Sequence, residues 1–170
     1  MAKVSTWKMT LPGPMLQRGF WLYVWQVETP KGEMLYVGRT GDNSSPHATA
    51  PYTRMGQHLE FQKTQNALRK QLKKRDVEPE NCQAFHLISH GPIYPEVEKR
   101  DIDTRQVLME RHMPPRNLVG AMEKALAEAL ATSGYDVLNE VKWSHPFDEA
   151  VWVTVREAFS EHFPNLRGAA

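Results

Sequence analysis

Two strand-like runs separated by a short turn constrain the fold of this chain more than any other feature. Residues 20–27 and 33–38 both mix aromatic and β-branched side chains with aliphatic ones, which is typical of strands. Residues 29–32 (TPKG) between them have the composition of a turn, so the whole stretch predicts a β-hairpin. The second strand runs directly into Gly38 and Arg39, and the residues around this glycine need either a packing reason or a chemical one.

A long helix is predicted after the hairpin. Residues 40–51 are small, polar and proline-rich, as in a surface loop, and a helix should begin near Tyr52. Apolar residues then recur at roughly helical spacing, namely Met55, Leu59, Leu68 and Leu72. The continuation of this helix carries the basic residues Lys63, Arg69, Lys70, Lys73, Lys74 and Arg75. These cations indicate either a solvated helix face or a stripe that binds a phosphate backbone.

The second half of the chain predicts one more strand and further helices. Residues 84–89 (AFHLIS) have the pattern of a third strand. The apolar residues 107–109 suggest a short helix that stops before the two prolines at 114–115. Residues 121–131 are rich in Ala, Leu, Glu and Lys and predict a strong helix, which should end around the Ser-Gly pair at 133–134.

The C-terminal residues predict a last helix. Residues 143–146 (WSHP) indicate its start, with Asp148 and Glu149 in its first turn. One apolar face is then expected from Val151, Val155 and Phe159. The whole order predicts an α+β fold in which a small sheet, the hairpin plus a third strand, is flanked by helices.

Length and composition limit the organisation and the setting of the protein. At 170 residues the chain fits one core, and we expect an N-terminal segment (1–18), a main domain (19–141) and a C-terminal helical extension (142–170) packed on it. The single cysteine and the absence of a long apolar run predict a cytoplasmic protein that does not enter membranes. A net charge of +1 gives no global attraction for nucleic acid, so such binding needs local clusters of charge.

Several residues with chemical potential lie on these predicted elements. Tyr23 and Tyr36 come from the two hairpin strands, where they could equally be ordinary half-buried tyrosines. Arg54 and His58 are four residues apart and share one face of a helix. Farther along the chain, Glu123 opens the Ala-rich helix and Asn139 follows its end.

In this order, these residues resemble the motifs of the GIY-YIG nuclease family over residues 19–139. Residues 36–38 read YVG, and residues 19–23 (GFWLY) stand where the first motif is expected. Residues 54–58 (RMGQH) match the arginine and histidine of the family's first helix. The family's glutamate and its final asparagine are matched by Glu123, in EKAL, and by Asn139.

The resemblance implies a metal-dependent DNA endonuclease that hydrolyses phosphodiester bonds. Glu123 would hold a single Mg²⁺ or Mn²⁺ ion, and Arg54 would grip the scissile phosphate. Tyr23 or Tyr36, helped by His58, would orient or deprotonate the attacking water. Arg39 would add a second cation at the rim of the site. If the substrate is DNA, the local cluster of charge predicts contacts to its backbone from Arg39, Lys63, Arg69, Lys70, Lys73 and Lys74. Within the resemblance, Gly38 would allow a tight backbone turn beside the phosphate.

Some assignments have alternatives. Trp21 or Trp25 competes with Tyr23 for the first motif position, although only Tyr23 carries a hydroxyl group. Glu128 could replace Glu123, and Asp136 could replace Asn139. Helical geometry favours Glu123, because an offset of five residues turns Glu128 by about 140° away from it and towards solvent.

Two other functions are compatible with the sequence. The first is a catalytically silent nucleic-acid-binding module on the same scaffold, which is expected if the glutamate does not face the tyrosines. The second is an enzyme of another class built on the seven histidines, but no pair of them has the spacing of an HExxH metal motif.

Overall fold

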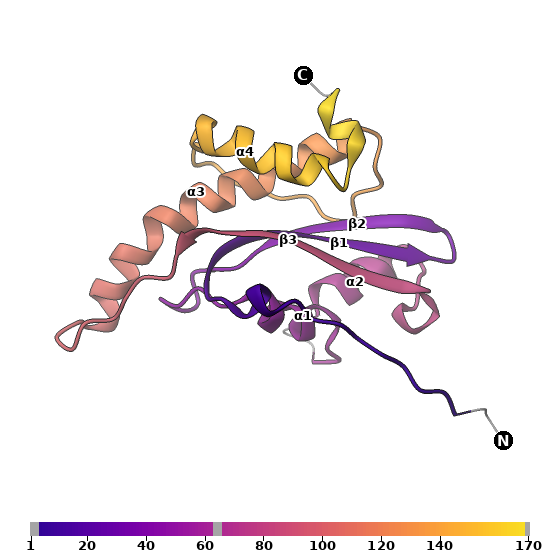
Figure 1. Cartoon of the computed structure of the whole chain (residues 1–170), viewed down its shortest axis with the longest axis horizontal. Coiled ribbons are helices and arrows are strands. Elements are labelled where there is room, and N and C mark those ends of the chain that lie inside the picture. Colours follow the sequence, from indigo (N-terminus) through magenta and orange to yellow (C-terminus); the bar gives the residue numbers. More distant parts are fainter. Residues whose placement is uncertain (1–3, 63–65, 169–170) are drawn as a thin grey trace.

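The core of the fold is a three-stranded antiparallel sheet with helices on both faces (Figure 1). The computed structural model describes residues 4–62 and 66–168. Strand β1 (Gly19–Thr29) is central, with β2 (Gly32–Arg39) on one side and β3 (Ala84–Pro95) on the other. The predicted hairpin and third strand are therefore confirmed, as is the α+β class.

Successive side chains of β1 point to opposite faces of the sheet, and a separate hydrophobic cluster lies on each face. Phe20, Leu22 and Val24 face one cluster, and Tyr23 and Trp25 face the other. Both sets are buried, because β1 is covered on both faces. β3 extends six residues beyond its predicted end at residue 89, since its pairing with β1 resumes after an irregularity in register.

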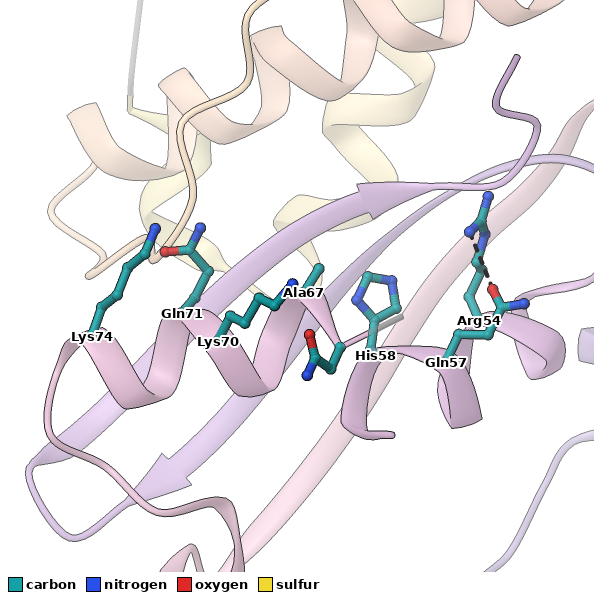
Figure 2. Close-up of a pocket in the computed structure, with 8 residues that line it drawn as sticks. Arg54, Gln57, His58, Ala67, Lys70, Gln71 and Lys74 are labelled. Carbon is teal, nitrogen blue, oxygen red and sulfur yellow. Dashed lines mark hydrogen bonds between the residues drawn. The ribbon is translucent and has the colours of Figure 1, made fainter. Parts of the chain in front are cut away.

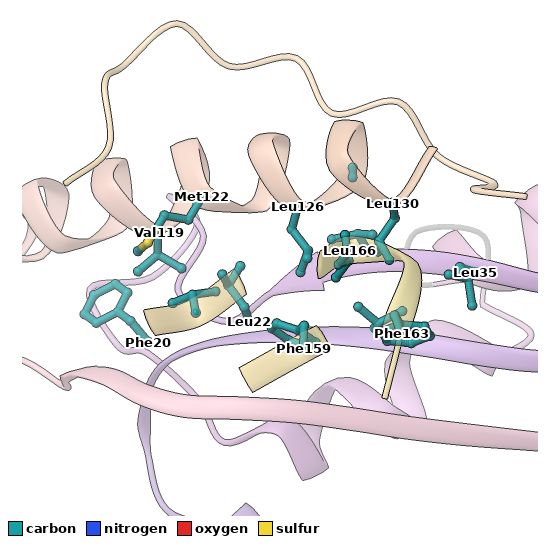
Figure 3. Packing of buried hydrophobic residues seen from close by; sticks show 14 of the residues in the cluster. Phe20, Leu22, Leu35, Val119, Met122, Leu126, Leu130, Phe159, Phe163 and Leu166 are labelled. Atoms are coloured by element: carbon teal, nitrogen blue, oxygen red, sulfur yellow. The ribbon is translucent and has the colours of Figure 1, made fainter. Parts of the chain in front are cut away.

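Helices α3 (Arg105–Thr132) and α4 (Glu149–Ser160) cover the first face (Figures 1 and 3). Figure 3 shows Met122, Leu126 and Leu130 of α3 directed towards the sheet, where Phe159 and Phe163 fill the remaining space. The C-terminal residues thus contribute buried side chains to the main core. No helix in the described part of the chain is long and apolar enough to cross a membrane.

The prediction of one long helix after the hairpin is wrong. The chain instead forms α1 (Pro51–Leu59) and α2 (Ala67–Lys74), and α1 ends where Glu60 adopts an extended backbone. Arg69 Nε of α2 donates a hydrogen bond to the carbonyl of Leu59 at 3.0 Å, which joins the end of α1 to α2. Two helices let apolar residues from both segments, including Met55, Leu68 and Leu72, pack against the same cluster.

The predicted break before the two prolines is also wrong, because α3 runs unbroken through Pro114 and Pro115. Each interior proline removes a backbone hydrogen bond and by itself costs about 3 kcal/mol. Buried side chains on both sides of the prolines, such as Leu108 and Val119, offset this cost by fixing both halves of the helix. The predicted end is confirmed, with Gly134 at a φ of 93° just beyond it.

Helix α4 begins at Glu149, later than the predicted start at residues 143–146. Asp148 caps it by accepting hydrogen bonds from the backbone N–H groups of Ala150 and Val151. Its predicted apolar face is confirmed, since Val155 and Phe159 are buried. A final 3₁₀ turn, η3 (Pro164–Arg167), follows it, and two others are η1 (Gly13–Leu16) and η2 (Pro79–Asn81).

Candidate active site

Tyr23 and His58 form the centre of the site. The Tyr23 hydroxyl and His58 Nε2 are joined by a buried hydrogen bond of 2.6 Å. The Tyr36 ring lies edge-on to His58, with 5.0 Å between ring centroids. Strand β1 presents Tyr23 on the same face as Tyr36 of β2, and α1 places His58 over both.

Gly38 is explained by this packing. It lies opposite Tyr23 in the β1–β2 ladder, and a Cβ atom at this position would come within 2.6 Å of the Tyr23 hydroxyl. The glycine therefore makes room for the phenol of the neighbouring strand. Its backbone is part of regular β2, so the expectation of a tight turn at Gly38 is wrong.

The two tryptophans near Tyr23 have other surroundings. Trp21 Nε1 donates to the carbonyl of Gln17 at 3.1 Å. Trp25 is buried and lies edge-on to His58 at 6.4 Å, but only Tyr23 brings a hydroxyl group to the imidazole. Of these three aromatic residues, Tyr23 is therefore the one that places a hydroxyl group beside His58.

These three side chains are neutral around pH 7, and burial moves their pKa values farther from it. Burial raises the pKa of Tyr23 well above its usual value and that of Tyr36 to about 12, and Arg54 lowers both only in part. Burial, helped by the positive charge of Arg54, lowers the pKa of His58 to about 4. In this structure Arg54 thus does not bring either phenol into the range of a base at pH 7.

Arg54 is held at the edge of the site by a residue that the sequence patterns did not single out. Its Nη2 donates to Asp42 Oδ2 at 2.7 Å, and Nη1 donates to Gln57 at 3.1 Å. Burial raises the pKa of Asp42, but hydrogen bonds from Ser44 and Arg54 outweigh this and lower it to about 2. Asp42 is therefore a carboxylate at neutral pH and fixes the guanidinium of Arg54.

His112 supports Asp42 from α3. Its Nε2 lies 2.7 Å from the backbone carbonyl of Asp42, and the imidazole is fully buried beside Phe20. A signal for Asp42 was present in the sequence, because an aspartate two residues before Ser44 typically forms a local turn. No local signal identified His112, whose partner lies 70 residues away.

Glu123 of α3 approaches the site from the other side of β2. Its Oε2 lies 2.9 Å from Arg39 Nε, and the two side chains are only 15% and 10% exposed. Burial raises the pKa of Glu123 to about 7, although Arg39, Arg54 and Arg116 all favour its charged form. The charge of Glu123 also raises the pKa of both Tyr23 and Tyr36, so the carboxylate lies near the phenols.

Arg39 lies in the interior of this site, where it was expected at the rim. Besides its ion pair with Glu123, it donates to the carbonyl of Gly41, and its guanidinium lies 4.7 Å from the centre of the Trp143 ring. Trp143 in turn is seated on α3, where its Nε1 donates to the carbonyl of Asn117 at 3.0 Å. A Cβ atom at Gly120 would collide with this indole at 2.4 Å.

Glu128, the alternative to Glu123, points away. Its side chain is 67% exposed and lies 3.7 Å from Lys124 on the same helix. The angular argument from the sequence is therefore confirmed for these two glutamates. In all, the structure brings together Tyr23, Tyr36, Arg54, His58 and Glu123.

Asn139 is placed at the edge of the sheet. Its Oδ1 accepts from the backbone N–H of Val37 at 2.9 Å, and its Nδ2 donates to the Val37 carbonyl at 2.8 Å. Two backbone hydrogen bonds between Leu35 and residues 136 and 138 extend this contact along β2. Asn139 thus supports the strand that carries Tyr36. Asp136, its alternative, pairs with Arg75.

The basic residues predicted to form one stripe have different surroundings in the structure. Arg69 is buried, with an ion pair to Glu80 at 2.7 Å and its guanidinium 4.1 Å from the Phe61 ring centre. Lys73 lies 3.4 Å from Glu78, and Lys63 is outside the described residues. Of the stripe residues that the structure describes, Lys70 and Lys74 line a recess that also contains Arg54 and His58 (Figure 2).

A divalent ion is chemically compatible with one part of this site. Within residues 4–62 and 66–168, no three His, Cys, Asp or Glu side chains cluster as a metal-binding group. Mg²⁺ does not need such a group, because it keeps several waters and is often bound by one or two carboxylates together with substrate phosphates. Glu123, a carboxylate beside Arg54, fits that requirement.

Comparison with known proteins adds no relative to this description. No protein-family model, no curated protein and no solved structure matches the chain.

Proposed function

We propose that this protein is a metal-dependent DNA endonuclease that hydrolyses phosphodiester bonds with a GIY-YIG-type site. One observation carries the proposal: Tyr23, Tyr36, His58, Arg54 and Glu123 come from four separate elements, β1, β2, α1 and α3, and lie close together beside the hairpin. A core that only needed to be stable would gain little from placing two arginines and a carboxylate beside buried phenols.

Arg54 binds the scissile phosphate. Its side chain is 22% exposed, and its Nε is buried without a hydrogen-bond partner, so the guanidinium can donate to further acceptors. Asp42 keeps the group in one orientation, which reduces the entropy lost when the phosphate binds. The positive charge then offsets the negative charge that develops on the phosphoryl oxygens.

Tyr23 and His58 orient and deprotonate the attacking water. A neutral phenol is a weak base, but its oxygen can accept a hydrogen bond from water while its proton is transferred to His58 Nε2. The low pKa of His58 leaves the imidazole unprotonated at neutral pH, so Nε2 can accept the hydrogen bond from the Tyr23 hydroxyl, although the same low pKa makes it a weak base. Tyr36 contacts the same imidazole and restricts its orientation.

Glu123 would hold the Mg²⁺ or Mn²⁺ ion. When bound, such an ion stabilises the departing 3′-oxygen as a Lewis acid. The carboxylate must first leave its ion pair with Arg39, and an incoming DNA phosphate is a suitable new partner for that guanidinium.

Cleavage of supercoiled plasmid by purified protein tests the proposal directly. Nicked or linear product should form with Mg²⁺ or Mn²⁺ and should disappear in excess chelator. Cleavage that continues undiminished in chelator would contradict the role of the metal.

The ion pair between Arg39 and Glu123 favours a second candidate, a catalytically silent nucleic-acid-binding module on the same scaffold. In such a module the carboxylate would serve permanently as a buried partner for Arg39. DNA binding without cleavage at any tested concentration of Mg²⁺ or Mn²⁺ would select this function over the endonuclease.

A further inference from the structure

A recess beside the candidate active site shares Arg54 and His58 with it, but its other lining residues are not used by the chemistry described above. Helices α1 and α2 line it, with Arg54 and His58 at one end and Lys70 and Lys74 along α2 (Figure 2). Its volume is about 310 Å³, which is near the lower end of the range for ligand sites in proteins. The recess is therefore large enough for a small ligand group next to the site.

The lining of the recess has the chemistry of an anion site with hydrogen-bonding capacity. The eight described residues that form it include two lysines, an arginine and a histidine, but no carboxylate. Three carboxamides complete the polar lining, those of Gln57, Asn66 and Gln71. Cations bind phosphate groups, and carboxamides can donate to and accept from the edge of a nucleobase.

Three of these side chains carry buried polar atoms without a hydrogen-bond partner. They are Arg54 Nε, His58 Nδ1 and Asn66 Oδ1. Buried polar atoms are nearly always hydrogen-bonded, so three such atoms around one recess point to a polar group that binds there. Asn66 precedes α2 without capping it through its side chain, which leaves its amide available to a ligand.

We propose that the recess binds the nucleotide adjacent to the scissile phosphate. Lys70 and Lys74 hold the sugar–phosphate backbone of this nucleotide, and Asn66 and Gln71 contact the edge of its base. This inference rests on the proposed endonuclease, because Arg54 belongs to both sites. It makes α2 the element that determines which base is preferred next to the cleaved bond.

Titration of the full chain with thymidine 5′-monophosphate tests this inference. NMR spectra recorded with chelator present monitor binding without cleavage. The side-chain NH₂ signals of Asn66 and Gln71 should shift on titration with the nucleotide. Inorganic phosphate alone should leave these two signals nearly unchanged. Lys74→Gln should weaken nucleotide binding by at least about fivefold, through the loss of one charged contact.

Lys73→Gln is the matched control, because it removes the same charge from the same helix but outside the recess. It should change the affinity less than about twofold. Equal effects of the two lysine variants, or shifts confined to residues outside the recess, would overturn the inference. Asn66→Ala should reduce the differences in affinity among the four nucleoside monophosphates, and unchanged differences would also count against it.

The result also separates this inference from the proposed function. Nucleotide binding in the recess by a protein that never cleaves DNA would support the subsite and contradict the endonuclease. Metal-dependent cleavage by a protein whose Asn66 and Gln71 NMR signals do not shift with the nucleotide would support the endonuclease and contradict the subsite.

Discussion

Arg39 and Glu123 form an ion pair of 2.9 Å that links β2 to α3 inside the candidate active site. The same carboxylate is the group proposed to bind the divalent ion. Under the proposed function a guanidinium and a metal ion would therefore compete for one ligand. In the free protein that ligand is paired with Arg39.

Arg39→Met should tighten Mn²⁺ binding by at least about tenfold, because it removes the competing cation from Glu123. Electron paramagnetic resonance of free Mn²⁺ at pH 8 measures the affinity. Arg116→Gln is the control, since Arg116 also acts on the charge of Glu123 but forms no ion pair with it. If both variants tighten binding equally, the ion pair is not a specific competitor.

Arg54→Ala should lower the rate of cleavage by roughly 10²- to 10³-fold, as expected for the loss of a positioned charge in the transition state. Its partly exposed pair with Asp42 contributes at most about 1 kcal/mol to stability. Arg75→Ala provides a comparison, because it breaks a surface ion pair with Asp136. An Arg54 variant that melts earlier but cleaves normally would make this residue purely structural.

Glu123→Gln should abolish cleavage and retain DNA binding, because it removes the anionic metal ligand while keeping the shape of the side chain. Glu128→Gln should behave like the unmodified protein, since that side chain is exposed on the outer face of α3. Gel-shift and plasmid-cleavage assays on both variants measure the two properties. The opposite pattern would move the metal ligand to Glu128.

His58 should make the protein less stable in mild acid. The unfolded chain binds a proton at this imidazole below about pH 6.5, whereas the folded protein does so only near its pKa of about 4. The free energy of unfolding therefore falls as the pH decreases from 6.5 to 4, by up to about 3 kcal/mol.

The pKa of Glu123, raised to about 7, has the opposite effect, because the folded protein keeps a proton that the unfolded chain releases above about pH 4.5. Urea unfolding of the unmodified protein and of His58→Gln isolates the histidine contribution. The pH dependence should become weaker in acid for the variant. Parallel curves for the two proteins would show that His58 does not titrate in this way.

Gly38→Ala should destabilise the fold by about 1–3 kcal/mol and reduce cleavage, because the added methyl group displaces the Tyr23 ring. Gly56→Ala is a matched control in α1, where a Cβ atom meets no other atom within 4 Å. That variant should be more stable by about 0.5–1 kcal/mol, owing to higher helix propensity. Thermal unfolding of both proteins checks the sign of each change.

The sequence alone determined those features that depend on neighbours along the chain. The aromatic and β-branched composition of the two strands and the TPKG turn predicted the hairpin, because strand and turn preferences act within a few residues. The angle between Glu123 and Glu128 follows from the geometry of any α-helix, so the exposed position of Glu128 was predictable as well.

Only the tertiary structure decided which distant groups meet. Arg69 looked like part of an exposed basic stripe until the fold enclosed it between Phe61 and Glu80. The prolines of α3 would break an isolated helix, but packing against the sheet outweighs their local cost. Local preferences amount to fractions of a kcal/mol per residue, whereas a buried side chain contributes several times more.

The candidate site, too, was predictable from the sequence only in part. The residue types and their order suggested Tyr23, Arg54, His58 and Glu123, but not the roles of their partners. Asp42 aligns Arg54, Asn139 binds the backbone of β2, and Arg39 occupies the carboxylate of Glu123. Each of these contacts joins residues at least 12 positions apart, so it exists only after the sheet and its helices have packed together.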